Sequence, residues 1–118
     1  MPARSNYSRG RDTEYLARDL LILHGFQVVR SAGSHTPIDL VAWQDGGHPR
    51  LIQVKRSNSH LDETVRVTRA YRQDIEALRT ISRPMGSTVE LWVRTPHKGW
   101  QFYSILHSGI CDVMNDGE

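Results

Sequence analysis

The sequence predicts an α/β fold in which one mixed β-sheet of about five strands is flanked by helices. Two observations support this prediction. Short apolar segments rich in Val, Ile and aromatic residues alternate with turns that contain Gly, Pro or Asp. Two longer segments place their apolar residues three or four positions apart, as one face of a helix requires. Along the chain these segments follow the order αβββαββ, a pattern of helices packed on a sheet.

The first helix is expected from about Arg11 to His24, and Gly25 is a suitable stop just past its end. The preceding residues, 1–10, are polar and basic, and we expect them to form a flexible tail. Because leucines recur at helical spacing, the helix has an apolar face. This face consists of Leu16, Leu20 and Leu23, with Ala17 and Leu21 beside them.

Three strands are expected next, at Phe26–Arg30, Ile38–Trp43 and Arg50–Lys55. The segment 31–37 (Ser-Ala-Gly-Ser-His-Thr-Pro) is a loop by composition, and Asp-Gly-Gly at 45–47 is a turn. Because this turn is short, the second and third strands should form a hairpin.

A polar connection then leads to a second helix, expected at Val67–Ser82 and followed by Pro84. Two further strands are expected at Val89–Arg94 and Trp100–Leu106, on either side of a turn, and the segment after Gly109 stays unassigned. Helical spacing gives the second helix a buried stripe. The stripe consists of Tyr71, Ile75, Leu78 and Ile81.

Composition and length indicate one folded domain, at residues 11–118. Hydrophobic residues make up 38% and charged residues 24% of the 118 positions, which is a globular composition. No apolar run approaches the ~20 residues of a membrane span, and the N-terminus lacks the apolar core of a signal peptide. The single cysteine, Cys111, excludes an internal disulfide. We therefore expect a cytoplasmic protein with no membrane partner.

Three polar residues should meet at one end of the predicted hairpin. Asp39 begins the second strand, and Gln53 and Lys55 end the third. The start of one hairpin strand lies beside the end of the next, so Asp39 should adjoin the other two. Gln53 and Lys55 are two positions apart and therefore point to the same face of the sheet.

Such a group suits phosphodiester hydrolysis, in which a hydroxide attacks and the phosphate gains negative charge. A hard cation neutralises that charge and acidifies a bound water, and Mg²⁺ prefers oxygen ligands. Asp39 offers a carboxylate, Gln53 an amide oxygen and Val54 its backbone carbonyl. Lys55 is placed to orient the water or stabilise the phosphate charge. Glu14, on the first helix, can add a second carboxylate, directly or through water.

These residues resemble the PD-(D/E)XK nuclease superfamily. The resemblance rests on Glu14, then Ile38-Asp39, then Gln53-Val54-Lys55. The segments Gly25-Phe26-Gln27-Val28-Val29-Arg30, Gly33-Ser34 and Ile38-Asp39-Leu40-Val41-Ala42 are similar to archaeal-type Holliday junction resolvases. Asp39-Leu40-Val41-Ala42 with Ile52-Gln53-Val54-Lys55-Arg56 is also similar to the catalytic domain of Mrr-type restriction enzymes.

The resemblance implies a restriction-endonuclease-like fold and a single nuclease domain. It further implies an endodeoxyribonuclease of DNA recombination and repair that uses Mg²⁺ (with Mn²⁺ as a substitute), forms a homodimer and cuts four-way junction DNA. Glu14, Asp39 and Lys55 are the implied catalytic positions, with Gln53 beside them. Ser31 or Ser34, in the loop before Asp39, would contact the scissile region.

The sequence departs from the resolvase pattern at Gln53. Most resolvases of this kind carry Glu there, whereas the Mrr-like branch carries Gln. A neutral amide binds Mg²⁺ more weakly than a carboxylate does. Two alternatives therefore stay open: an Mrr-like restriction or repair nuclease, and a DNA-binding module without catalysis. A carboxylate elsewhere would compensate; Glu63, Asp74 and Glu76 are candidates that spacing alone does not separate, although Glu76 is favoured to pair with Arg72 or Arg79.

The basic residues are candidates for contacts with the DNA backbone. Thirteen are Arg and two are Lys, and Arg pairs with phosphate through a planar fork. Such contacts give affinity without sequence choice; a solvated helix face and a disordered tail are the competing interpretations. The residues predicted to contact DNA are Arg9, Arg11, Ser31, Ser34, His35, Arg56, Arg69 and Arg72.

Overall fold

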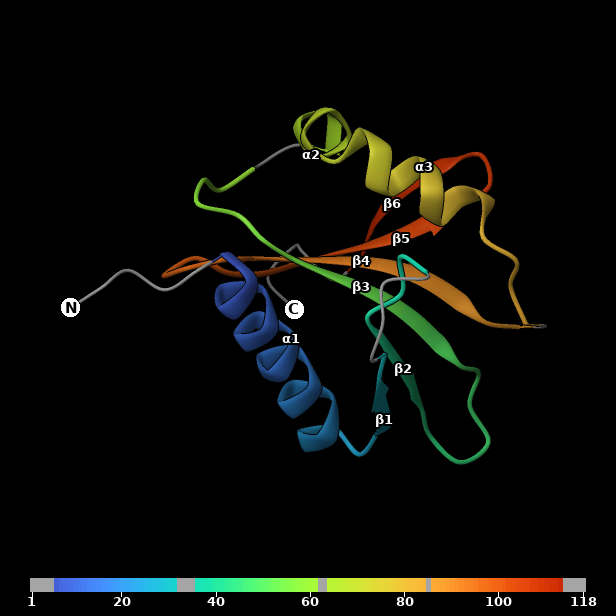
Figure 1. Ribbon diagram of the computed structural model, residues 1–118. Helices are drawn as coiled ribbons and strands as arrows, with labels where there is room; N and C mark the ends of the chain where they lie inside the picture. The colour runs from blue at the N-terminus through green and yellow to red at the C-terminus, as the bar shows by residue number, and fades with distance from the viewer. Residues whose placement is uncertain (1–5, 32–35, 62–63, 85, 114–118) are drawn as a thin grey trace.

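The structure is a computed structural model that describes residues 6–31, 36–61, 64–84 and 86–113. A six-stranded sheet lies between helix α1 on one face and helices α2 and α3 on the other (Figure 1). The elements are α1 (Asn6–Leu23), β1 (Gln27–Arg30), β2 (Leu40–Trp43), β3 (Arg50–Arg56), α2 (Thr64–Ala70), α3 (Arg72–Thr80), β4 (Thr88–Thr95), β5 (Gly99–Leu106) and β6 (Gly109–Val113).

The strands lie in sequence order across the sheet, β1 to β6. Only β3 and β4 are parallel, and α2 and α3 form the crossover that joins them; the remaining pairs are antiparallel. The mixed sheet and the β2–β3 hairpin are thus confirmed, with Leu40 opposite Ile52. The sixth strand was not predicted, because its five residues carry no clear alternation and it is recognisable only through pairing with β5.

The core lies in two layers because side chains alternate across each strand. On one face, Ile52, Val54 and Trp92 pack against Ala17 and Leu21 of α1. On the other face, strand residues pack against the crossover helices; the principal members are Leu51, Leu91, Val93, Tyr103, Ile105, Val67, Ile75 and Leu78. The central strands β3 and β4 supply side chains to both layers, so they connect α1 on one face to the crossover helices on the other.

Helix α1 differs from its prediction in extent and in orientation. It begins at Asn6, so residues 6–10 of the expected tail are helical; residues 1–5 lie outside the described part of the chain. Ala17 and Leu21 are buried, whereas Leu16 is 45% and Leu23 80% exposed. The small side chain of Ala17 brings the helix close to the sheet, so the leucine face is rotated away from it.

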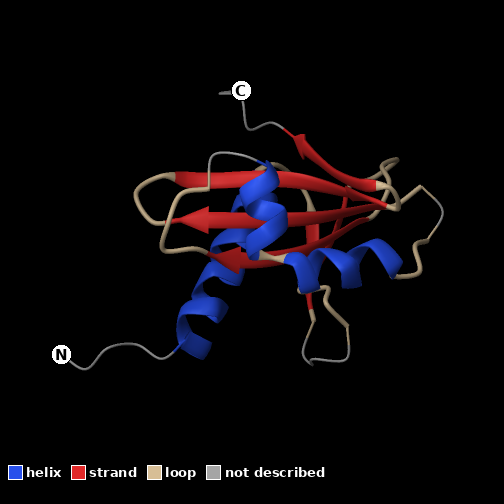
Figure 2. Cartoon of the chain, turned by 90° about the horizontal axis from the view of Figure 1, so that it is seen from above, coloured by secondary structure: helices blue, strands red, loops and turns tan. Residues whose placement is uncertain are grey.

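The predicted second helix is two helices with a bend at Tyr71, which has non-helical backbone angles (φ −120°, ψ 34°). Seen from above, α2 and α3 meet at an angle over the strands (Figure 2). The bend allows Val67 of α2 and Ile75 and Leu78 of α3 all to reach the same core. The predicted stripe is otherwise confirmed, since Tyr71 and Ile81 pack against this cluster. None of the helices in the described ranges is long and apolar enough to cross a bilayer.

Candidate active site

A pocket of about 360 Å³ opens where β3 ends beside the first turns of α1. Its lining comes from three segments that are distant in sequence: α1, the residue before β2, and the end of β3 with the following loop. The lining residues are Gly10, Glu14, Asp39, Gln53, Val54, Lys55, Arg56 and Asn58. The structure therefore brings together all the residues predicted for catalysis and metal binding.

Asp39 is held against the end of β3 by two hydrogen bonds. Its backbone N–H donates to the carbonyl of Ile52 at 2.9 Å, and its Oδ2 accepts from the Val54 N–H at 2.8 Å. The pKa of the Asp39 carboxyl is raised to about 6: burial is the largest cause and Glu14 adds to it, while the Val54 N–H, Lys55 and Arg30 oppose the rise. The carboxylate is therefore short of compensating positive charge, which a cation in the pocket would supply.

Gln53 and Lys55 extend from β3 towards α3, where both contact one oxygen of Asp74. Gln53 Nε2 lies 3.4 Å from Asp74 Oδ1, and Lys55 Nζ lies 3.3 Å from the same atom. The side chain of Gln53 is buried, yet its Oε1 has no hydrogen-bond partner within the described structure. Of the three carboxylates that the sequence left undecided, Asp74 lies behind the pocket, in contact with Gln53 and Lys55. Glu76 pairs with Arg79 at 2.9 Å, as favoured, and Glu63 lies outside the described residues.

Glu14 reaches the pocket from α1 but also forms an ion pair with the guanidinium of Arg30. Arg30 Nε donates to Glu14 Oε1 at 3.0 Å, and the Arg30 guanidinium lies over the ring of Tyr15, 5.0 Å from its centroid. Arg30 was not among the residues predicted for the site, since its position depends on how β1 packs beside α1. The available signal was its place at the end of the first predicted strand, Phe26–Arg30; in the structure it lies opposite Leu40.

The donor set suits a hard divalent cation. In the described ranges, no group of three His, Cys, Asp or Glu side chains is arranged to hold a metal. The pocket instead offers the carboxylates of Asp39 and Glu14 and the unpartnered amide oxygen of Gln53. A buried acceptor without a partner costs free energy, and oxygen ligands of this mixed type are those that Mg²⁺ accepts. The residues present therefore fit such an ion.

The residues predicted to contact DNA differ in where the structure places them. Arg56 lines the pocket, exposed, and donates to Asn58 Oδ1 at 2.8 Å. Arg11 on α1, Arg69 on α2 and Arg72 on α3 are also exposed, whereas the backbone N–H of Ser31 donates to the carbonyl of Asp39 at 2.8 Å. The side chain of Arg9, together with Ser34 and His35, lies outside what the structure describes.

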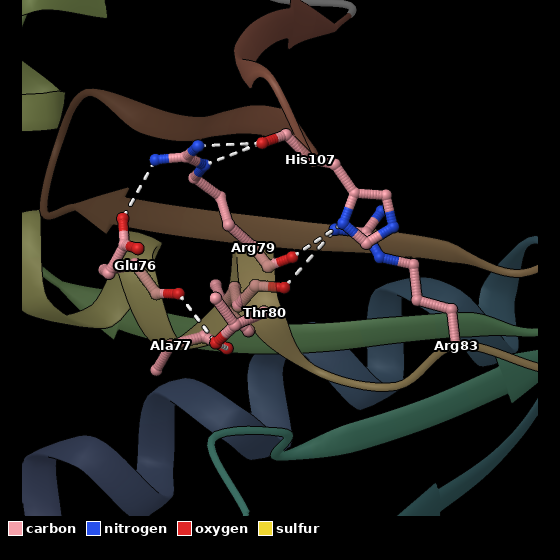
Figure 3. Close-up of polar contacts among 7 residues, drawn as sticks. Glu76, Ala77, Arg79, Thr80, Arg83 and His107 are labelled. Carbon is pink, nitrogen blue, oxygen red and sulfur yellow. Dashed lines mark hydrogen bonds and ion pairs between the residues drawn. The ribbon is translucent and has the colours of Figure 1, made fainter.

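The remaining arginines at the end of α3 bind the protein itself (Figure 3). Arg79 donates to the carbonyl of His107 through Nε at 3.0 Å and Nη2 at 2.8 Å. His107 Nδ1 lies 2.9 Å from the carbonyl of Arg79, and Arg83 donates to the carbonyl of Ile105 at 2.8 Å. These two arginines anchor the end of α3 and the residues after it to β5 and the following turn, whereas Arg69 and Arg72 are exposed.

Fold and site together define a nuclease of the PD-(D/E)XK type, with Gln at the position of the second acidic residue. A family model described as "Archaeal holliday junction resolvase (hjc)" matches residues 5–109, and the chain belongs to that family. Among solved structures, the chain is similar to Hjc of Archaeoglobus fulgidus, a Holliday junction resolvase from an archaeal hyperthermophile. The two share 26% identity over 82% of this chain and 73% of that chain, with a TM-score of 0.62. Both comparisons support a structure-specific, junction-resolving nuclease.

Proposed function

We propose that this chain is a Mg²⁺-dependent endonuclease that acts as a homodimer on four-way DNA junctions. The observation that carries the proposal is the pocket in which Glu14, Asp39, Gln53 and Lys55 meet, in a chain that belongs to a family of junction resolvases. The Archaeoglobus protein, described as a Holliday junction resolvase, supports the choice of substrate.

Asp39 and Gln53 Oε1 would hold the ion, together with Glu14 and the carbonyl of Val54. The ion would supply a Lewis acid for the phosphate and lower the pKa of a bound water. Asp39 is already fixed by the Val54 N–H, so it would bind without rearranging the strand. Lys55 would donate to the scissile phosphate or to the attacking water, where its charge favours the transition state.

Exposed arginines near the pocket would hold the DNA backbone. Arg56 at the pocket edge and Arg11 on α1 are closest in sequence to the catalytic residues, while Arg69 and Arg72 belong to the crossover. Ser31, whose N–H donates to the carbonyl of Asp39, would contact the scissile region, and we propose that Arg9, Ser34 and His35 also bind DNA. Because two symmetric nicks need two active sites, the homodimer follows from the substrate.

The proposal is tested with a labelled four-way junction incubated beside linear duplex and single-stranded DNA, in Mg²⁺ or Mn²⁺. Paired symmetric nicks in the junction alone, absent in Asp39→Ala, are the expected result. Cutting of linear duplex would instead indicate an Mrr-like restriction or repair nuclease. Junction binding without cutting in either metal would mean a DNA-binding module, because Gln53 is the position at which catalysis would have been lost.

A further inference from the structure

The strongest feature that the proposed function leaves unused is Asp74. It projects from the first turn of α3 towards the end of β3, where its Oδ1 faces Gln53 Nε2 at 3.4 Å and Lys55 Nζ at 3.3 Å. Asp74 does not line the pocket. It therefore lies behind two residues that do, and its side chain is one third exposed.

The contact with Asp74 fixes which way the amide of Gln53 points. A carboxylate only accepts hydrogen bonds, whereas an amide has a donating NH₂ branch and an accepting oxygen branch. Gln53 must therefore present Nε2 to Asp74, and Oε1 is left on the other branch. That oxygen is buried and has no partner among the described residues, although buried acceptors are nearly always satisfied.

We propose that Asp74 is a positioning residue that holds the amide of Gln53 with Oε1 directed at the bound cation and keeps the Lys55 ammonium beside it. This inference rests on the proposed function. It also gives a physical reason for Gln at position 53. A Glu at position 53 would place its carboxylate against that of Asp74, and two like charges in contact are unfavourable.

Metal affinity measured without DNA tests the proposal, by titrating metal-free protein with Mn²⁺ in a calorimeter. Asp74→Asn should weaken the Mn²⁺ Kd about tenfold, because an Asn side chain both donates and accepts and so no longer fixes the orientation of the Gln53 amide. Glu76→Gln is the matched control. It removes an acidic charge two positions away on the same helix, from a residue paired with Arg79, and its Kd should stay within twofold.

The second arm repeats Asp74→Asn in a Gln53→Glu background. A carboxylate carries an oxygen on both branches, so it needs no orientation. Asp74→Asn should then weaken the Kd less than threefold. Equal losses in the two backgrounds would overturn the inference, since Asp74 would then act as a direct ligand or through charge alone. No Mn²⁺ binding by the wild-type chain would defeat the proposed function and this inference together.

Thermal unfolding of the metal-free proteins provides a second readout. Gln53→Glu should lower the Tm, because it places two carboxylates in contact, and adding Asp74→Asn should restore it. Failure of the double variant to recover the Tm would contradict the contact on which the inference depends. A Gln53→Glu protein that unfolds completely while the double variant folds would support it.

Discussion

Two carboxylates from other segments lie beside opposite ends of strand β3, the buried Glu90 of β4 and the half-buried Asp39 before β2, and their pKa values shift in opposite directions. At the Arg50 end, burial pulls the pKa of Glu90 upward, yet hydrogen bonds and charge from Arg50, with Thr88 and Trp92, lower it overall. Arg50 donates to Glu90 through Nε at 2.8 Å and Nη2 at 2.6 Å. At the Lys55 end, burial dominates, and the pKa of Asp39 rises to about 6.

The two carboxylates differ in how fully hydrogen-bond donors and positive charge compensate them. Every oxygen of Glu90 is occupied: Thr88 Oγ1 donates to Oε2 at 2.6 Å and Trp92 Nε1 to Oε1 at 2.9 Å. The Asp39 carboxylate accepts from the Val54 N–H and lines an open pocket together with a second carboxylate, Glu14. A carboxylate whose burial is incompletely offset is a candidate for binding or catalysis.

The contrast between Asp39 and Glu90 would fail if both carboxylates were equally important for activity. Asp39→Asn should reduce single-turnover junction cleavage in Mg²⁺ by more than ~100-fold, because the charge that attracts the cation is gone. Junction affinity should stay within about threefold, since phosphate contacts are untouched. Glu90→Gln, measured under the same conditions on folded protein, should cleave at close to the wild-type rate. A comparable loss in both variants would contradict the division of roles.

Glu90 should matter most for stability. Glu90→Gln leaves the guanidinium of Arg50 without its counter-charge, and we expect the free energy of unfolding to fall by about 3 kcal/mol at pH 7. Urea denaturation measures this loss. Because the folded-state pKa of Glu90 lies below its ordinary value of 4.5, the contribution is present above that pH and is lost as the pH falls through the folded-state pKa. A variant as stable as wild type would show that the network contributes little.

Asp39 should have the opposite effect on stability. Its folded-state pKa, about 6, lies above its ordinary value of 3.8, so the free energy of unfolding decreases as the pH rises from about 4 to about 6. Asp39→Asn keeps an oxygen for the Val54 N–H and should be ~1–3 kcal/mol more stable than wild type at pH 8. Below about pH 4 the variant and the wild type should have the same free energy of unfolding. Urea denaturation at several pH values in metal-free buffer tests this, and a pH-independent difference would count against it.

A third carboxylate, on the surface, sharpens the contrast. Glu76 pairs with Arg79 at 2.9 Å, but its side chain is 61% exposed. Exposed pairs contribute little, so Glu76→Gln should lower the free energy of unfolding by less than ~0.5 kcal/mol. This change should also diminish further at high salt. A loss as large as that of Glu90→Gln would mean that distance, not burial, sets the strength of these pairs.

The part of the candidate site formed by Asp39, Gln53 and Lys55 was predictable because it is local in topology. A short turn joins β2 to β3, so Asp39 had to lie near Gln53 once both strands were recognised. The face of α1 was not predictable in the same way, since leucine spacing alone did not reveal that Ala17 would lie against the sheet. Tyr71 gives no sequence signal for a bend that packing imposes. Arg30 and Asp74 were not selected, because their roles depend on how helices lie over strands.

The bent crossover has a consequence for the order in which the site is assembled. The hairpin that joins Asp39 to Val54 closes a short loop, whereas the β3–β4 pair closes the longer connection that contains α2 and α3. Closing the longer connection costs more chain entropy, so the hairpin half of the pocket should form first during folding. Asp74 arrives with the crossover, and local opening of α3 in the native protein would release Gln53 while leaving Asp39 in place.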